Sequence, residues 1–123
     1  TGANLKGAKL YVAKLSRANL SRANLLSADL THAGLYAADL FRAKLSGANL
    51  NYASLLSADL TGANLKGASL SRANLTNANL TGIYLNKTIL PSNLILDNTT
   101  ADPKTRKILL EARKRDEEHL FAD

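Results

Sequence analysis

The hydrophobic positions of this chain recur every five residues. Leu occupies every fifth position from Leu5 to Leu90, and Ala stands two residues before it from Ala3 to Ala78. Asn or Asp fills the position between Ala and Leu in ten of those sixteen units. The two residues after each Leu are mostly Ser, Thr, Gly, Arg or Lys. Each unit therefore combines a fixed apolar pair with a variable polar pair.

An α-helix cannot accommodate this spacing. Five residues advance about 500° in a helix of 3.6 residues per turn, so successive Leu side chains would drift by about 140° and spiral around the surface. In an extended segment, residues two apart point to the same side, and the polar pair that follows suits a turn. Each unit therefore predicts a short straight side and a corner. Stacked coils of such sides form a solenoid with Leu inside.

The segments ANLSR, ADLTH and ANLKG show the motif A-(N/D)-L-x-x, and through it residues 1–90 resemble the pentapeptide-repeat family. The resemblance implies an all-β solenoid, a right-handed quadrilateral β-helix with four repeats per coil. The residues alone leave the coil length open. The segment TGANLKGA recurs at 1–8 and 61–68, and this shift of twelve repeats fits coils of three, four or six repeats alike.

The repeat loses its regularity near its C-terminal end. Ile83 and Thr88 replace the expected Ala, and Pro91, which lacks a backbone donor, is suited to end a ladder. A helical segment follows, with Asp102 as its expected N-cap. The sequence thus predicts three segments: a pentapeptide-repeat β-helix (1–90), a terminating loop (91–101) and a C-terminal α-helix that caps the last coil (102–121).

Both ends of the solenoid are also candidate dimer contacts. The resemblance to some family members implies that the C-terminal helix could dimerise instead of capping. The N-terminal end at Thr1 has no visible cap, so upstream residues or another chain would cover it. Because Thr1 lies within the repeat, we expect a processed or excised product, and an upstream targeting segment could have been lost.

Composition and charge limit the classes of partner that the chain could bind. Residues 1–100 contain ten Lys or Arg and four Asp, whereas residues 101–123 contain six basic and six acidic residues, so the whole net charge of +6 lies in the repeats. This balance favours acidic partners, although a modest excess is common on protein surfaces. No run approaches the roughly 20 apolar residues that cross a bilayer. The sequence predicts a soluble protein without membrane contact and leaves its compartment open.

No motif for catalysis, metals or cofactors emerges. His32 and His119 have no acidic ligands near them, and each is interpreted as a lone surface histidine. In coils of four repeats Asp39 and Asp59 would stack, too close together unless hydrogen-bonded, but no base or pocket accompanies them. A filled shaft leaves no cleft. We therefore expect a protein that is not an enzyme and takes no cofactor or metal.

Apolar and aromatic residues at turn positions, where most repeats have polar residues, are candidates for binding a partner, together with neighbouring Arg. In four-repeat coils Tyr36 stacks under Leu56, Arg22 stacks under Arg42, and Phe41 follows one turn after Tyr36. The predicted partner surface comprises Arg22, Tyr36, Phe41, Arg42 and Leu56. Aromatic residues with Arg are typical of interface hot spots. The alternative is that these are scattered exposed apolar residues, which are normal.

The sequence thus predicts a non-enzymatic structural or protein-interaction module with an unknown protein partner. Two alternatives stay open. One is a DNA mimic that inhibits a type II topoisomerase (gyrase), as some relatives do, but such mimicry requires an acidic surface. The other is weak nucleic-acid binding by the basic shaft, although its Lys and Arg form no dense stripe. The unbroken Ala and Leu columns also leave open a designed consensus repeat.

Overall fold

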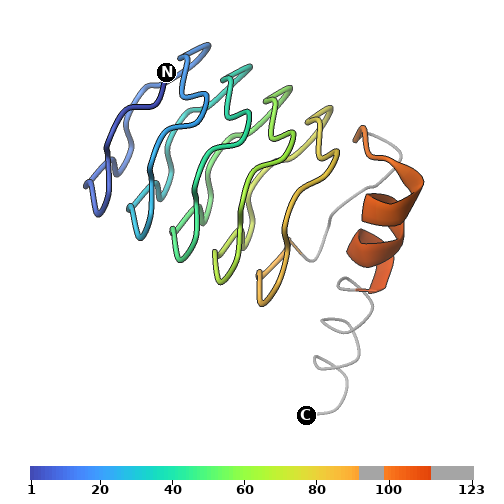
Figure 1. The fold of residues 1–123 in the computed structure, drawn as a ribbon. Coiled ribbons are helices and arrows are strands. Elements are labelled where there is room, and N and C mark those ends of the chain that lie inside the picture. Colours follow the sequence, from blue (N-terminus) through green and yellow to red (C-terminus); the bar gives the residue numbers. More distant parts are fainter. Residues whose placement is uncertain (92–98, 112–123) are drawn as a thin grey trace.

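The computed structural model describes residues 1–91 and 99–111 as a β-helical shaft with one α-helix at its C-terminal end (Figure 1). The shaft is a right-handed quadrilateral β-helix of pentapeptide repeats, as the resemblance implied. Each side contributes one paired residue to each neighbouring coil, so the ladder consists of isolated bridges and no longer strands form. The helix spans 103–111, and the predicted continuation to 121 lies outside the described residues.

Parallel bridges join the central residue of each side to the matching residue four repeats later, as from Asn4 to Asn24 and from Asn24 to Lys44. The N–H of Leu5 donates to the carbonyl of Asn24 at 2.7 Å, and the N–H of Asn24 donates to the carbonyl of Ala3 at 2.8 Å. These two bonds repeat around the shaft. Of the coil lengths that the sequence left open, the structure has the coil of four repeats.

Each corner is a tight turn whose second residue has a positive φ. At the first complete corner the N–H of Ala8 donates to the carbonyl of Leu5 at 2.9 Å, and Gly7 has a φ of +66°. A positive φ at the second corner residue, and not at the first, is the pattern of a type II turn. The second corner residues at five-residue intervals from 2 to 87 all have a φ between +54° and +69°, but only six of them are glycine. The other twelve accept a conformation that costs an L-residue about 1–2 kcal/mol.

The Asn and Asp residues between Ala and Leu form side-chain hydrogen bonds with the backbone of the next corner. All ten accept, through Oδ1, a hydrogen bond from the backbone N–H two residues later, at 2.9–3.3 Å. This local bond explains the preference for Asn and Asp at these positions. It also holds the stacked carboxylates of Asp39 and Asp59, at 3.0 and 2.9 Å. At Asp29 the hydroxyl and N–H of Thr31 both donate, and they lower the pKa of this carboxyl.

Leu and Ala side chains fill the shaft. The ten Leu residues from Leu25 to Leu70 are at most 1% exposed, whereas Leu5, Leu10 and Leu15 in the first coil are half-buried. Ile83, in the Ala column, is buried too. No buried side-chain N or O atom within 1–91 and 99–111 lacks a hydrogen-bond partner. The interior is therefore a closed apolar column.

The C-terminal end of the shaft receives residues from beyond the repeats. Thr100 pairs with Asn79, so the bridge ladder extends into the segment predicted as a loop. Leu109 of the helix is fully buried in the same cluster as the Leu columns. No helix in the described part of the chain is long and apolar enough to cross a membrane. The division at 90/91 and the loop over 91–101 stay predictions.

Asp102 links the helix to the corner at Gly82. The helix begins at Pro103, so Asp102 stands at the predicted N-cap position. Its Oδ1 accepts a hydrogen bond from the N–H of Gly82 at 3.2 Å, and the hydroxyl of Thr105 accepts one from the same N–H at 3.1 Å. The Thr105 hydroxyl is the main cause of a lowered pKa at Asp102. The charged carboxylate is therefore the form that holds this contact.

The corner geometry predicts opposite effects for two Gly→Ala substitutions. At Gly67, with a φ of +69°, Ala should lower the free energy of unfolding by about 1 kcal/mol. The nearest atom to the added Cβ would be 3.9 Å away at both sites, so crowding does not enter. Gly34 lies outside the positive-φ region, and Ala there should raise stability by roughly 0.4–1 kcal/mol. Urea denaturation measures both, and equal shifts would contradict the corner geometry.

Candidate protein-interaction surface

Side chains at the corners stack along the shaft because residues four repeats apart lie in adjacent coils. Two of the resulting contacts join an Arg at the second corner position to an aromatic ring at the first corner position of the next coil. The Cζ atom of Arg17 lies 5.8 Å from the ring centroid of Tyr36, and that of Arg22 lies 5.7 Å from that of Phe41. The four-repeat coil thus places Arg17 and Arg22 next to aromatic side chains of the following coil.

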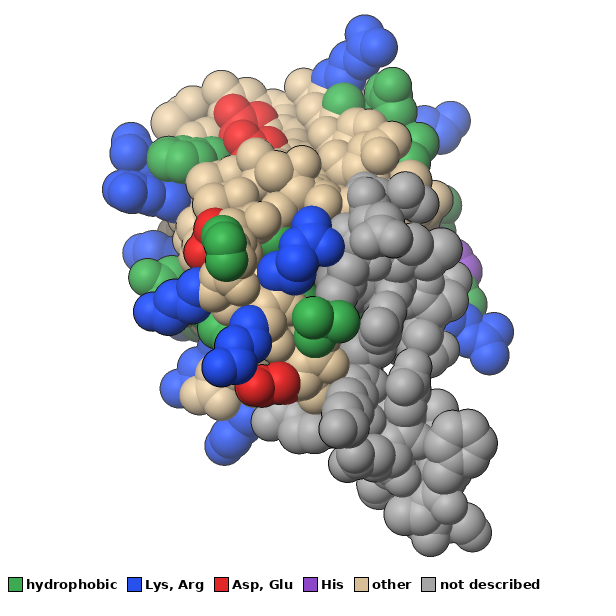
Figure 2. All heavy atoms as spheres, turned by 90° about the vertical axis from the view of Figure 1, so that its right-hand side faces the viewer, with side chains coloured by type: hydrophobic (Ala, Val, Ile, Leu, Met, Phe, Trp, Pro, Cys, Tyr) green, Lys and Arg blue, Asp and Glu red, His purple; other side chains and the backbone are tan. Residues whose placement is uncertain are grey.

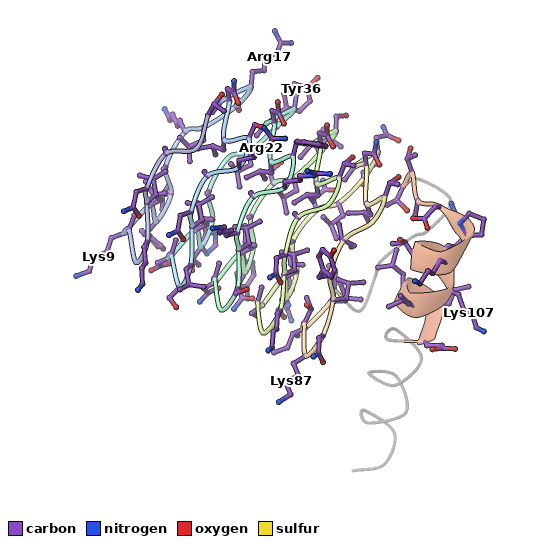
Figure 3. All side chains as sticks on the ribbon, in the orientation of Figure 1. Lys9, Arg17, Arg22, Tyr36, Lys87 and Lys107 are labelled. Atoms are coloured by element: carbon purple, nitrogen blue, oxygen red, sulfur yellow. The ribbon has the colours of Figure 1, made fainter. Side chains whose placement is uncertain are left out.

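The structure divides the predicted partner surface between two neighbouring corners. At one corner Arg22 and Arg42 both lie over the Phe41 ring, with Arg42 Cζ 5.3 Å from its centroid. We call Arg22, Phe41 and Arg42 the Phe41 cluster. At the preceding corner Tyr36 lies with Arg17, which the sequence analysis did not include, and Leu56 occupies the same corner one coil further. Figure 3 shows Arg17 and Tyr36 side by side at one edge of the shaft.

An acidic side connects these two corners. Asp39 stands at its centre, between Tyr36 and Phe41, and Asp59 occupies the same place in the next coil. No ring contact joins Tyr36 to Phe41 in the described part of the chain. The predicted surface is therefore two arginine–aromatic corners with carboxylates between them.

Another corner carries an aromatic column that the sequence analysis missed. His32 and Tyr52 stack with ring centroids 4.7 Å apart and planes 4° apart, and Tyr11 meets His32 edge-on at 5.9 Å. Arg72 lies over Tyr52 at 5.9 Å. His32 is a surface histidine, as predicted, but it is not isolated, because His32, Tyr52 and Arg72 hold the same corner position in successive coils. Their spacing of four repeats was the signal, and it becomes readable only once the coil length is known.

A depression of about 460 Å³ lies beside the Phe41 cluster. Its lining residues are Phe41, Arg42, Thr61, Gly62, Thr81, Gly82 and Tyr84. It forms because Gly62 and Gly82 follow Arg22 and Arg42 in the same corner column and carry no side chain. The lining includes no carboxylate or imidazole. No group of three or more potential metal ligands exists among the residues that the structure describes.

Positive charge is spread around the shaft and is not gathered on one face. Figure 2, which looks at the C-terminal end, shows Lys and Arg side chains at several places around the circumference. The same side chains occupy several different corners and sides of the coil, as Figure 3 shows for Lys9, Arg17 and Lys87. A dense basic stripe is therefore absent from the described surface.

The chain belongs to the pentapeptide-repeat family. The family profile of pentapeptide repeats matches residues 1–35, 38–77 and 53–91. A search of curated proteins found no match.

Several proteins of known structure are similar to this chain. A pentapeptide repeat protein from the Arabidopsis thaliana thylakoid lumen is 29% identical, with 68% of each chain covered and a TM-score of 0.49. A pentapeptide repeat protein of the cyanobacterium Cyanothece is 32% identical over 83% of this chain and 86% of its own, with a TM-score of 0.37. A plasmid-mediated fluoroquinolone resistance protein is 17% identical over 90% and 70%, with a TM-score of 0.42.

The Phe41 cluster predicts an energetic coupling between its members. A double-mutant cycle of Arg22→Ala and Phe41→Ala, measured by urea denaturation, should give a coupling of about 0.5–1 kcal/mol, as for an exposed cation–π pair. The matched cycle of Arg17→Ala and Phe41→Ala joins residues of different corners and should give a coupling near zero. Equal couplings in the two cycles would show that the ring contact contributes nothing specific.

Proposed function

We propose that this pentapeptide repeat protein is a non-enzymatic module that binds a protein partner through arginine–aromatic corners of a rigid shaft. The Phe41 cluster is the observation that supports the proposal most directly. Two guanidinium groups lie over its ring, at positions that follow from the coil itself. Because the regular coil fixes the backbone that carries these side chains, this site loses less conformational freedom on binding than a mobile loop would. Arg and aromatic residues dominate interface hot spots.

The closed interior supports a binding role over catalysis. Ala and Leu fill the shaft, and the depression beside Phe41 is lined by one charged residue, Arg42. General acid–base catalysis needs titratable groups within reach of one substrate atom. The stacked carboxylates of Asp39 and Asp59 serve instead to hold backbone N–H groups at the corners.

The two nucleic-acid alternatives have weaker support. A DNA mimic needs an acidic surface, and the shaft has a net positive charge with only one stacked pair of Asp side chains. The similarity to the fluoroquinolone resistance protein is at 17% identity and carries no functional argument. A basic nucleic-acid site needs a row of cations along the phosphates, whereas here Arg and Lys are dispersed.

Capture experiments with matched variants test the proposal. Protein partners retained by the immobilised full chain should be lost with the double variant Phe41→Ala/Arg42→Ala. The variant Tyr52→Ala/Arg72→Ala removes the same types of side chain from another corner, and it should retain those partners. Mass spectrometry of the captured proteins measures both.

Three results would contradict the proposed function. One is an unchanged set of partners with the Phe41→Ala/Arg42→Ala variant. Another is retention on DNA that falls steeply with salt, which would indicate phosphate contacts. The third is inhibition of topoisomerase supercoiling by micromolar protein, which would restore the DNA-mimic alternative.

A further inference from the structure

The depression beside Phe41 is a groove that opens where a column of arginines ends. Along this corner the second position is Arg22, then Arg42, then Gly62 and Gly82 in the following coils. A Cβ on Gly62 would lie 3.1 Å from Cγ and 3.9 Å from Nε of Arg42. The Arg42 side chain therefore extends beside Gly62 and closes the groove at its N-terminal end.

Arg42 lines the N-terminal end of the groove, and the carboxylate of Asp102 lies just beyond its C-terminal end. Arg42 makes no ion pair with any residue that the structure describes, so its charge is available. At the other end Asp102 binds the N–H of Gly82. Two coil spacings, roughly 10 Å, separate the corner of Arg42 from the corner at Gly82 that Asp102 contacts. An extended peptide covers this distance in about three residues.

The walls between these charges suit a peptide. Phe41 lies along one wall, and Tyr84, which is 64% exposed, lies along the other. The corners at Gly62 and Gly82 leave the backbone uncovered between them, so a ligand chain could approach closely. Aromatic walls with a few polar groups at the ends are the usual build of a small binding site.

We propose that this groove binds an extended peptide segment that carries an acidic and a basic side chain about three residues apart, with an apolar side chain between them. The acidic side chain pairs with Arg42, the basic one lies toward Asp102, and the apolar one packs between Phe41 and Tyr84. This inference rests on the proposed function, since it assigns the chemistry of the partner that the Phe41 cluster would meet.

Nearby acidic groups favour a peptide over a nucleic acid. Asp102 lies just beyond the C-terminal end of the groove, and Asp59 accepts a hydrogen bond from the N–H of Thr61 in its wall. Both carboxylates would repel the phosphates of a strand that follows the groove. A peptide with a basic side chain gains from the same groups.

Fluorescence polarisation with labelled peptides tests the groove. The probes are fluorescein-labelled Gly-Glu-Phe-Gly-Lys-Gly, the reversed-order peptide Gly-Lys-Gly-Phe-Glu-Gly, and a neutral peptide with Gln in place of both charged residues. At least one charged probe should bind the full chain, and the neutral probe should bind about tenfold more weakly. Gly62→Arg, which continues the arginine column into the groove, should weaken binding of the charged probe by at least about tenfold.

Two further variants keep the outcome interpretable. Gly67→Arg adds the same charge at a corner with the same positive φ outside the groove, and binding should be unchanged. Arg42→Gln removes the cation from an exposed side chain without filling the groove, and it should weaken the charged probe but not the neutral one. Melting curves followed by circular dichroism confirm that each variant folds.

The proposal is overturned if no probe binds, if the neutral probe binds as tightly as the charged ones, or if Gly62→Arg binds like the wild type. It is also overturned if a labelled oligodeoxythymidine binds in a manner that Gly62→Arg abolishes. If partner capture depends on Phe41 but is unaffected by Gly62→Arg, the groove is not the binding site, and the proposed function still holds. If partner capture does not depend on Phe41, the proposed function itself is contradicted.

Discussion

The corner turn fixes nearly every other feature of this molecule. In each turn the Ala N–H bonds to the preceding Leu carbonyl, and the second corner residue adopts a positive φ. Four such turns close a coil, so each side chain lies beside its counterparts four repeats before and four repeats after it. Ala and Leu are thereby placed inside, and Asn or Asp is placed where Oδ1 can reach the next corner. The same turn leaves two residues per repeat free to vary.

Chemistry on this fold is therefore confined to the corners and to the centres of the sides. A corner side chain has neighbours in the coils before and after it. The contacts that a residue makes at one corner therefore depend on which residues hold the same corner in the adjacent coils. Arg22 becomes part of a cluster because Phe41 lies in the next coil. Glycine matters in the same way, since Gly62 and Gly82 leave a groove where the column of arginines ends.

The fold could be predicted from the sequence because the Ala and Leu spacing excludes a helix and matches a known repeat. The coil length could not be predicted, since the Ala and Leu columns align equally well for a coil of any whole number of repeats. Register information lies only in the variable residues, such as the stacked His32 and Tyr52. The contact of Asp102 with Gly82 was invisible for another reason: it joins the repeats to a segment without periodicity. The candidate surface stays a prediction, and its division between two corners became visible only in the coordinates.

Disulfide formation between pairs of introduced cysteines tests the four-repeat coil most directly, because the chain has no Cys of its own. A Cβ on Gly47 would lie 3.4 Å from Oγ of Ser27, which is close enough for a disulfide. Ser27→Cys with Gly47→Cys should therefore cross-link rapidly under mild oxidation. Ser27→Cys paired with Arg42→Cys or with Ser57→Cys, at spacings that suit coils of three or six repeats, should stay reduced. Preferential cross-linking of either of these two pairs would contradict the account.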